Sequence, residues 1–248
     1  MKILIASGGS GGHIFPALAF VRELACKDVK IIFAASKRQL DKRLLEAIPC
    51  KKVFLSANPM PYKFGFKTIV FLTKLAADSI RSLWLLIWEK PDIAVGFGGY
   101  TAGAVMLMAR AMGIKTLIHE QNLIPGRTNK FLDKFVDRIA VSFNDTKKYL
   151  NNKNVIFTGN PLRKESLLNC RSDAFKKFKL NPEKVTILVM GGSQGAASLN
   201  AKALEAAASL TMEEREKIQI LHITGDNMRE MVKEFYKKNS ITGSVHAF

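Results

Sequence analysis

The chain opens with MKILIASGGSGGHIFPALAF (residues 1–20), which combines an apolar run, a glycine-rich turn and the start of a helical pattern. Apolar and β-branched residues at 2–7 predict a strand, and the glycines that follow end it at once. A strand that runs through a short turn directly into a helix is the first half of a βαβ unit, from which parallel sheets are built. We therefore expect an α/β fold that begins with the first residues.

The same alternation continues as far as residue 158. Short apolar runs separated by longer segments of helical periodicity indicate a parallel sheet with helices on both faces, which is a doubly wound, Rossmann-like domain. The predicted strands are 2–7, 29–34, 51–55, 92–97, 115–119, 138–142 and 154–158. The predicted helices lie between them, at 16–27, 39–47, 66–90, 101–112 and 128–137.

The pattern breaks at Gly-Asn-Pro-Leu-Arg, residues 159–163, because Pro161 lacks a backbone donor and disfavours a helical predecessor. We place a domain boundary here, with one Rossmann-like domain at 1–160 and the start of a second at 161–248. Further strands are predicted at 185–190 and 218–224, and further helices at 197–209 and 226–238. Such domains usually have on the order of 100–150 residues, so we expect the second to be incomplete; a naturally small domain is the alternative. Residues 244–248 resemble the start of another strand.

The composition limits the partners and the compartment. The net charge of +17, from 38 Lys and Arg against 21 Asp and Glu, predicts attraction to nucleic acid, an anionic bilayer or phosphorylated substrates. The three cysteines, Cys26, Cys50 and Cys170, are scattered and lack CxxC spacing, which suits a reducing compartment. The first residues have no long apolar signal-peptide core. We therefore expect a cytoplasmic location.

Three glycine-rich turns each follow a predicted strand and open a helix: GGSGGH at 8–13, GGY at 98–100 and GGSQGA at 191–196. Glycine allows close approach of a ligand to the backbone, and free amides at the positive end of a helix dipole bind anions. Ligands of open α/β sheets lie beyond the carboxyl ends of the strands. The three turns together predict binding of diphosphates, although any one of them can serve only to pack a strand against a helix.

Two common nucleotide sites are disfavoured. Ile14 stands where the G-x-G-x-x-G fingerprint needs its third glycine, and Ala34-Ala35-Ser36 at the end of the second strand offers no acidic residue for a ribose. This argues against NAD. The sequence also lacks GxxxxGK[ST], which a P-loop ATPase needs. There is no DxD motif and the histidines lack ligand spacing, so we expect neither metal nor cofactor, with helix ends and basic side chains neutralising the phosphates.

Polar residues stand beside the turns. His13 closes the first turn, where an imidazole can accept a proton from an attacking hydroxyl, although a structural histidine is the alternative. His-Glu-Gln-Asn at 119–122 follows an apolar strand directly. Within it, Glu120 is a second candidate base, or an orienting partner for His13 or His119. A polar strand end that hydrogen-bonds its own loop is the alternative. Arg163 can clamp a phosphate through its guanidinium, although an ordinary surface arginine is the alternative.

The segment 61–90 combines aromatic and aliphatic residues with interleaved lysines and arginine. A charge at the middle of a bilayer costs about 2.5–3.5 kcal/mol, so this segment is not expected to span a membrane. An apolar face flanked by cations and tipped with Trp suits the surface of an anionic membrane; a helix that faces only the core is the alternative. Nucleic acid explains the aromatic cluster less well. The residues expected at the membrane are Phe64, Phe66, Phe71, Leu75, Trp84 and Trp88.

Five ordered motifs resemble one family: GGSGGHIFPALA at 8–19, GFGGYTAGAV at 96–105, HEQNLIPGRTNK at 119–130, TGNPLR at 158–163 and GGSQGAASLN at 191–200. Together they are similar to the bacterial GlcNAc transferases that form lipid II of peptidoglycan, the MurG family. A weaker resemblance is to diacylglycerol glycosyltransferases. Both groups have the GT-B architecture of two Rossmann-like domains. Members of the family continue into a uracil- and ribose-binding region that this sequence does not include.

The resemblance implies an inverting, metal-independent transfer of GlcNAc from UDP-GlcNAc to undecaprenyl-diphospho-MurNAc-pentapeptide, at the cytoplasmic membrane face. It also assigns roles to matching residues. Ser10, Gly11 and Gly12 would form the substrate-contacting first turn, with His13 as the candidate base. Asn122, Arg163, Ser193 and Gln194 would contact the UDP-sugar, and Tyr100, His119, Glu120 and Asn129 would line the acceptor side. A related glycolipid transferase and a non-catalytic basic protein that binds anionic lipid are the alternatives.

Overall fold

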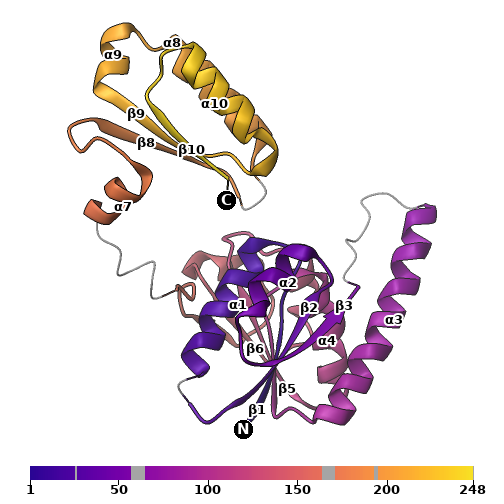
Figure 1. Ribbon diagram of the computed structural model, residues 1–248. Helices are drawn as coiled ribbons and strands as arrows, with labels where there is room; N and C mark the ends of the chain where they lie inside the picture. The colour runs from indigo at the N-terminus through magenta and orange to yellow at the C-terminus, as the bar shows by residue number, and fades with distance from the viewer. Residues whose placement is uncertain (26, 57–64, 164–170, 193–194, 248) are drawn as a thin grey trace. The chain divides into compact units, whose positions relative to one another are not determined.

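The computed structural model describes residues 1–25, 27–56, 65–163, 171–192 and 195–247. The chain divides into two compact units, Met1–Lys164 and Glu165–Phe248. In Figure 1 the first unit runs from indigo to pink and the second from orange to yellow.

The first unit is built on a seven-stranded parallel sheet with the order β3-β2-β1-β4-β5-β6-β7. The predicted doubly wound α/β fold is therefore confirmed. The central strand β1 pairs with both β2 and β4, so the strand order reverses there, and ligands of such sheets bind at this reversal. The strands are β1 Lys2–Ala6, β2 Lys30–Ser36, β3 Lys51–Leu55, β4 Ile93–Gly96, β5 Lys115–Glu120, β6 Arg138–Val141 and β7 Val155–Phe157.

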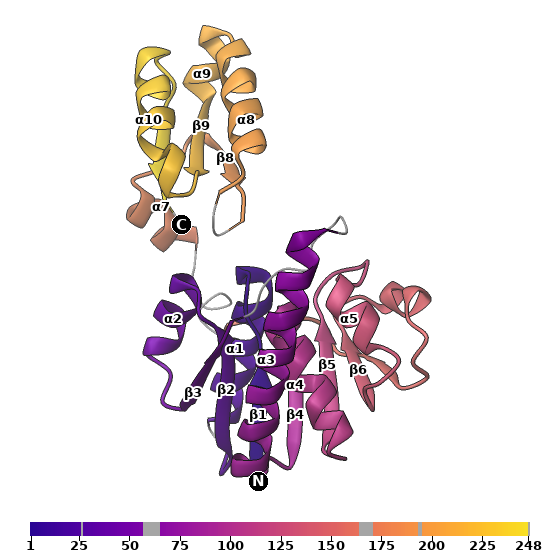
Figure 2. The ribbon, with the colours of Figure 1, turned by 90° about the vertical axis from the view of Figure 1, so that its right-hand side faces the viewer.

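Helices cover both faces of this sheet (Figures 1 and 2). Alternation along β1 produces the two faces: Ile3 and Ile5 pack in one core cluster with residues of α1, and Leu4 and Ala6 pack in another with residues of α4. The helices are α1 Gly11–Leu24, α2 Gln39–Glu46, α3 Phe66–Glu89, α4 Gly99–Ala111 and α5 Arg127–Leu132, followed by the 3-10 helix η1 Asn144–Tyr149.

Two helices begin earlier than the sequence patterns predicted. α1 starts at Gly11, with Pro16 inside it, and α4 starts at Gly99. Gly98 and Gly99 have φ values of +88° and +79°, which turn the chain straight from β4 into α4. The glycines therefore belong to the first helical turns, where backbone amides lack partners within the helix. This places anion-binding groups closer to the strand ends than predicted.

The second unit contains a three-stranded parallel sheet with the order β10-β9-β8. Its small core joins α8 and α10 to β9 through Leu204, Ile220 and Tyr236. Two helices, α7 and α9, were not predicted, although Thr211 and Glu214 form a capping box that marks the start of α9. The elements are α7 Arg171–Phe178, β8 Val185–Met190, α8 Ala197–Ser209, α9 Met212–Lys217, β9 Ile218–Ile223, η2 Asp226–Met228, α10 Arg229–Lys238 and β10 Gly243–His246.

Candidate functional site

The first two glycine-rich turns touch each other at the point where the strand order reverses. Gly8 follows β1, Gly99 follows Gly98 at the end of β4, and β1 and β4 are neighbours in the sheet. A Cβ atom on Gly99 would lie only 2.1 Å from the carbonyl oxygen of Gly8. Glycine is therefore required at position 99 by both its backbone angle and its surroundings. This contact brings the starts of α1 and α4 side by side.

A buried carboxylate holds the first turn. Asp41 of α2 is fully buried and accepts hydrogen bonds from the Gly9 amide, at 3.0 Å, and from the Ser36 hydroxyl. Arg38 donates to the Gly9 carbonyl at 2.5 Å. Sequence reasoning passed over Asp41. The one indication of it in the sequence is that Asp41 lies four positions before Leu45. This helical spacing puts a charged residue on the same core-facing side of α2 as the buried leucine.

His13 lies against the second turn and contacts the loop after β5. A Cβ on Gly98 would be 2.9 Å from Nδ1 of His13, so the imidazole packs directly on that glycine. Nδ1 of His13 is 3.1 Å from Oε1 of Gln121. The side-chain nitrogen Nε2 of Gln121 is 3.1 Å from Nδ1 of His119 and donates to the Phe97 carbonyl at 3.0 Å. Gln121 therefore connects the two histidines, a role that the sequence did not reveal.

The protonation state of His119 determines which groups donate and which accept in this hydrogen-bond network. Nε2 of His119 is 3.0 Å from the Gly159 carbonyl oxygen, an acceptor only, so Nε2 carries the proton. Burial lowers the pKa of His119, against the opposing effects of the Gly159 carbonyl and the Glu120 carboxylate, which keeps the ring neutral near pH 7. Its Nδ1 then accepts from Gln121, whose oxygen faces His13. In neutral His13 the proton is consequently on Nδ1, and Nε2 holds the free lone pair.

Glu120 organises the loop between β5 and α5. The carboxylate is fully buried and accepts from the Asn122 amide at 2.9 Å, the Asn122 side chain at 3.1 Å, the Gly126 amide at 3.0 Å and the Asn129 side chain at 2.9 Å. Asn129 also donates to the His119 carbonyl at 3.2 Å. The structure thus brings His119, Glu120, Asn122 and Asn129 together in one hydrogen-bonded loop.

The remaining predicted residues of the first unit surround these turns. Ser10 is the N-cap residue of α1 and is exposed, Gly11 is buried, and Gly12 is exposed. Tyr100 lies in the first turn of α4 and is half-buried. The guanidinium of Arg163 lies 4.9 Å from the ring centroid of Phe15, so it stacks on the first turns of α1.

The third glycine-rich turn follows β8 in the second unit. Ser193 and Gln194 lie outside the described residues. Gly195 has φ +78°, and a Cβ there would be 2.2 Å from the Thr224 carbonyl oxygen, so the turn packs tightly against the end of β9. Asn200 of α8 supports this contact by donating to the same carbonyl at 2.9 Å. Tight packing is therefore one role of Gly195.

The long helix α3 has two contrasting faces. Asp78, Ser82 and Leu86 are buried, whereas Trp84 and Trp88 are 58% and 76% exposed. Phe71 and Leu75, also expected at a membrane, are only half-exposed. Phe64 and the side chain of Phe66 lie outside the described part. Among the described side chains of α3, the large apolar ones that are exposed are Ile69, Leu72, Ile80, Trp84, Ile87 and Trp88. Among the described residues, no helix has the length and apolar character needed to cross a bilayer.

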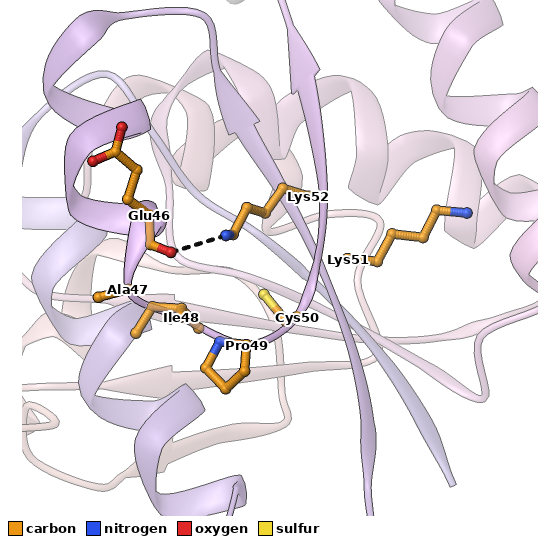
Figure 3. Close-up of a pocket in the computed structure, with 7 residues that line it drawn as sticks. All are labelled: Glu46, Ala47, Ile48, Pro49, Cys50, Lys51 and Lys52. Atoms are coloured by element: carbon orange, nitrogen blue, oxygen red, sulfur yellow. Dashed lines mark hydrogen bonds between the residues drawn. The ribbon is translucent and has the colours of Figure 1, made fainter.

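A surface hollow lies beside the start of β3. Figure 3 shows that seven consecutive residues, 46–52, line it, with Nζ of Lys52 donating to the Glu46 carbonyl at 3.3 Å. Burial raises the pKa of the Cys50 thiol, so this cysteine stays protonated near neutral pH. A single stretch of loop with a protonated thiol offers no converging chemistry, and we assign no site there. Within the described ranges, no group of three or more His, Cys, Asp or Glu could hold a metal.

Comparison with protein families places both units. Residues 3–141 match the glycosyltransferase family 28 N-terminal domain, and residues 186–248 match the corresponding C-terminal domain. Two similar proteins are each named UDP-N-acetylglucosamine--N-acetylmuramyl-(pentapeptide) pyrophosphoryl-undecaprenol N-acetylglucosamine transferase. The Bacillus subtilis protein is 35% identical over 99% of this chain and 67% of its own length. The Halalkalibacterium halodurans protein is 34% identical over 96% and 65%. The chain thus spans about two thirds of the length of these relatives.

Solved structures share the fold. The crystal structure of Acinetobacter baumannii MurG matches the whole chain and 65% of its own with a TM-score of 0.67 at 24% identity. The UDP-GlcNAc 2-epimerase of Neisseria meningitidis, bound to UDP-GlcNAc, matches the whole chain and 72% of its own with a TM-score of 0.65 at 17% identity. The family expected from the five sequence motifs is confirmed by the domain matches and by the relatives. The chain belongs to glycosyltransferase family 28.

Proposed function

We propose that the protein transfers GlcNAc from UDP-GlcNAc to undecaprenyl-diphospho-MurNAc-pentapeptide, the reaction for which its relatives in Bacillus subtilis and Halalkalibacterium halodurans are named. The observation that carries this proposal is the direct contact between the Gly8 and Gly99 turns, with His13 packed on Gly98. Two adjoining helix starts offer backbone amides to a diphosphate. A histidine at the same place supplies the proton acceptor that sugar transfer needs.

In the proposed reaction the acceptor diphosphate rests on the starts of α1 and α4. The acceptor hydroxyl oxygen forms a bond to the anomeric carbon of GlcNAc, and the bond from that carbon to UDP breaks. UDP leaves with the electron pair, and the hydroxyl proton passes to Nε2 of His13. Attack opposite to UDP inverts the configuration. A positioned general base of this kind contributes roughly 10²–10⁴-fold to the rate.

Gln121 prepares His13 for this role. Because the Gln121 oxygen faces Nδ1 of His13, the lone pair is held on the opposite ring nitrogen. His119 in turn fixes the orientation of the Gln121 amide. This is the logic of a base oriented by a second group, with an amide in place of the usual carboxylate.

We assign Glu120 a positioning role and not that of the base. Its four hydrogen bonds with Asn122, Gly126 and Asn129 occupy the carboxylate within the loop. The same bonds order Asn122, which we propose as a contact of the UDP-sugar together with Arg163. Asn129 lies beside the second turn, and we propose that it lines the binding site of the acceptor substrate together with Tyr100 and His119.

The donor diphosphate is proposed to bind at the third turn, with Ser193 and Gln194, at the start of α8. The amides of a helix start stabilise the charge that develops on departing UDP, in the way that oxyanion holes do. This electrostatic stabilisation requires neither a metal nor a cofactor. The proposed donor is therefore UDP-GlcNAc alone.

We also propose that the protein binds peripherally to the cytoplasmic face of the cell membrane through α3. Its exposed residues Ile69, Leu72, Ile80, Trp84 and Ile87 follow one another at intervals of three, eight, four and three positions, so they share one face of the helix. The exposed cation Arg81 and the net charge of +17 favour anionic headgroups. Nucleic acid is not a proposed partner, since this face is apolar.

The test is transfer of labelled GlcNAc from UDP-GlcNAc to a prenyl-diphospho-MurNAc-pentapeptide. It uses the 248-residue chain and a chimera that adds the part of the Bacillus subtilis relative outside the match. In the active form, His13→Ala should lower kcat roughly 10²–10⁴-fold. Failure of both proteins to transfer would overturn the proposal. Transfer to diacylglycerol alone would favour a glycolipid synthase, and binding of anionic vesicles without binding of UDP-GlcNAc would favour a non-catalytic protein.

A further inference from the structure

A cavity of about 380 Å³ lies between α3, α4 and α5 in the first unit. α3 contributes Phe71, Lys74, Leu75 and Asp78, and α4 contributes Tyr100, Gly103, Ala104 and Leu107. Both sets follow the spacing i, i+3, i+4, i+7, so each is one continuous face of its helix. Lys74 and Phe131 in its lining are exposed, so the cavity opens at the surface and is accessible to a ligand.

The walls of the cavity are mainly apolar. Phe71 and Leu75 of α3 face Leu107 of α4, and Phe131 of α5 completes the lining. The buried carboxylate of Asp78 also lines it, but this group accepts a hydrogen bond from the Ser56 amide at 3.0 Å. Apolar walls with few polar groups favour a hydrocarbon occupant.

The cavity adjoins the proposed diphosphate site. Its lining includes Tyr100, the residue that directly follows the Gly98–Gly99 turn. The cationic side chains of Lys74 and Arg127 also line it. A ligand whose diphosphate rests on the turn would therefore have its hydrocarbon chain next to the cavity, and the two positive charges in the lining favour an anionic ligand.

We propose that the cavity between α3, α4 and α5 binds the first isoprene units of a polyprenyl diphosphate. The identification of the bound hydrocarbon as a prenyl group rests on the proposed function. The presence of an apolar cavity beside the Gly98–Gly99 turn is independent of it. This site is distinct from the outer face of α3. Phe71, Lys74 and Leu75 line the cavity, whereas Ile80 and Trp84 belong to the exposed face of the helix.

The test is calorimetric titration of the 248-residue chain with inorganic pyrophosphate, dimethylallyl diphosphate and farnesyl diphosphate. Each buried methylene contributes roughly fourfold in affinity, so farnesyl diphosphate should bind at least about 30-fold more tightly than dimethylallyl diphosphate. Equal affinity of the two prenyl compounds would overturn the proposal. Displacement of farnesyl diphosphate by dioctanoylglycerol at similar concentrations would also overturn it, by identifying a site for acyl lipids.

Two variants place the binding in the cavity. Leu75→Trp fills it, and Phe131→Ser removes a wall residue that is 54% exposed, so its loss should not disturb folding. Both should weaken farnesyl diphosphate about 5- to 20-fold and leave pyrophosphate binding unchanged. The matched control is Phe157→Ser, at a β7 residue that is 55% exposed and outside the cavity. Equal effects of Phe131→Ser and Phe157→Ser would contradict the assignment.

The outcomes separate this inference from the proposed function. If GlcNAc transfer occurs but the cavity variants leave prenyl affinity unchanged, only the cavity assignment fails. If farnesyl diphosphate binds through the cavity but no GlcNAc is transferred, the proposed function fails and the site remains one for prenyl diphosphates.

Discussion

Nδ1 of His13 lies 3.1 Å from Oε1 of Gln121, although the two residues are 108 positions apart in the chain. The distance joins the start of α1 to the loop after β5, across β4. Because the Gln121 oxygen can only accept, it selects the tautomer of His13 that leaves Nε2 free. Gln121, an uncharged neighbour, thus leaves Nε2 of His13 able to accept a proton.

Replacing Gln121 by Leu should therefore impair the base without removing it. We expect kcat to fall by roughly 10- to 100-fold, less than for loss of the base itself, with little change in the affinity for UDP-GlcNAc. Nitrogen chemical shifts of the His13 ring should report more of the Nε2–H tautomer in Q121L than in the wild type. An unchanged tautomer together with a reduced kcat would show that Gln121 acts only through folding.

Glu120→Gln tests whether this residue positions the loop. One carboxylate oxygen becomes an NH₂ group that faces donors of Asn122 or Asn129, and each lost charge-assisted hydrogen bond costs about 1.5–3 kcal/mol. We expect the melting temperature to fall by roughly 5–10 °C. Glu46→Gln, at an exposed carboxylate, should leave it unchanged. A pH–rate profile that loses its acidic limb in E120Q would instead identify Glu120 as the base.

Gly99→Ala tests the contact between the two turns. Alanine at position 99 must adopt φ +79° and place its Cβ against the Gly8 carbonyl. Gly113→Ala is the matched control, because its φ is +73° and nothing lies within 4 Å. The control should cost about 1–2 kcal/mol of unfolding free energy, and Gly99→Ala roughly 1–3 kcal/mol more. Urea unfolding measures both; equal costs would show that the turns do not depend on close approach.

Ile80→Ser combined with Trp84→Ser tests the outer face of α3. These side chains are each 58% exposed, and burial of one in a bilayer surface is worth up to about 1.5–3 kcal/mol. Binding to anionic vesicles should weaken by roughly 10- to 100-fold in a sedimentation assay. Met212→Ser, at a residue 66% exposed in the second unit, should have no effect. Equal vesicle binding by all three proteins would remove α3 as the contact.

The stability of both units should depend on pH through His119 and His222. Burial lowers the pKa of each imidazole below its ordinary value of 6.5. The unfolded chain then binds protons more readily than the folded one, so stability is complete above pH 6.5 and declines as the pH falls. The slope is at most about 1.4 kcal/mol per pH unit for each histidine, and it vanishes below the folded-state pKa. Urea unfolding between pH 7.5 and 5 measures it, and His222→Asn should flatten the slope for the second unit.

The strands and turns were predictable because their signals are local. The strands are short apolar runs, and β1, β4, β7, β8 and β9 end at a glycine or within two residues of one. The alternation within β1 divides the two cores. The starts of α1 and α4 were predicted too late. Proline at position 16 and glycines at 98 and 99 usually mark boundaries, but here they lie within or directly before the helices.

The site was only partly predictable. The sequence singled out His13 and the loop residues His119, Glu120 and Asn122 as candidates, because polar residues beside strand ends are local patterns as well; their functional roles stay predictions. Asp41 and the bridging role of Gln121 were missed. Both depend on hydrogen bonds to residues distant in the sequence, which no periodicity encodes.

Residue order alone established the alternation of strands and helices, the positions of the glycine turns and the family motifs, since these arise from neighbouring residues. Tertiary packing alone decided that Gly99 touches Gly8, that Gln121 lies between two histidines, and that three helical faces enclose a cavity. The physical reason is that such relationships depend on which strands pair and how closely helices approach. Those distances are set by the packing of the whole sheet and not by any one segment.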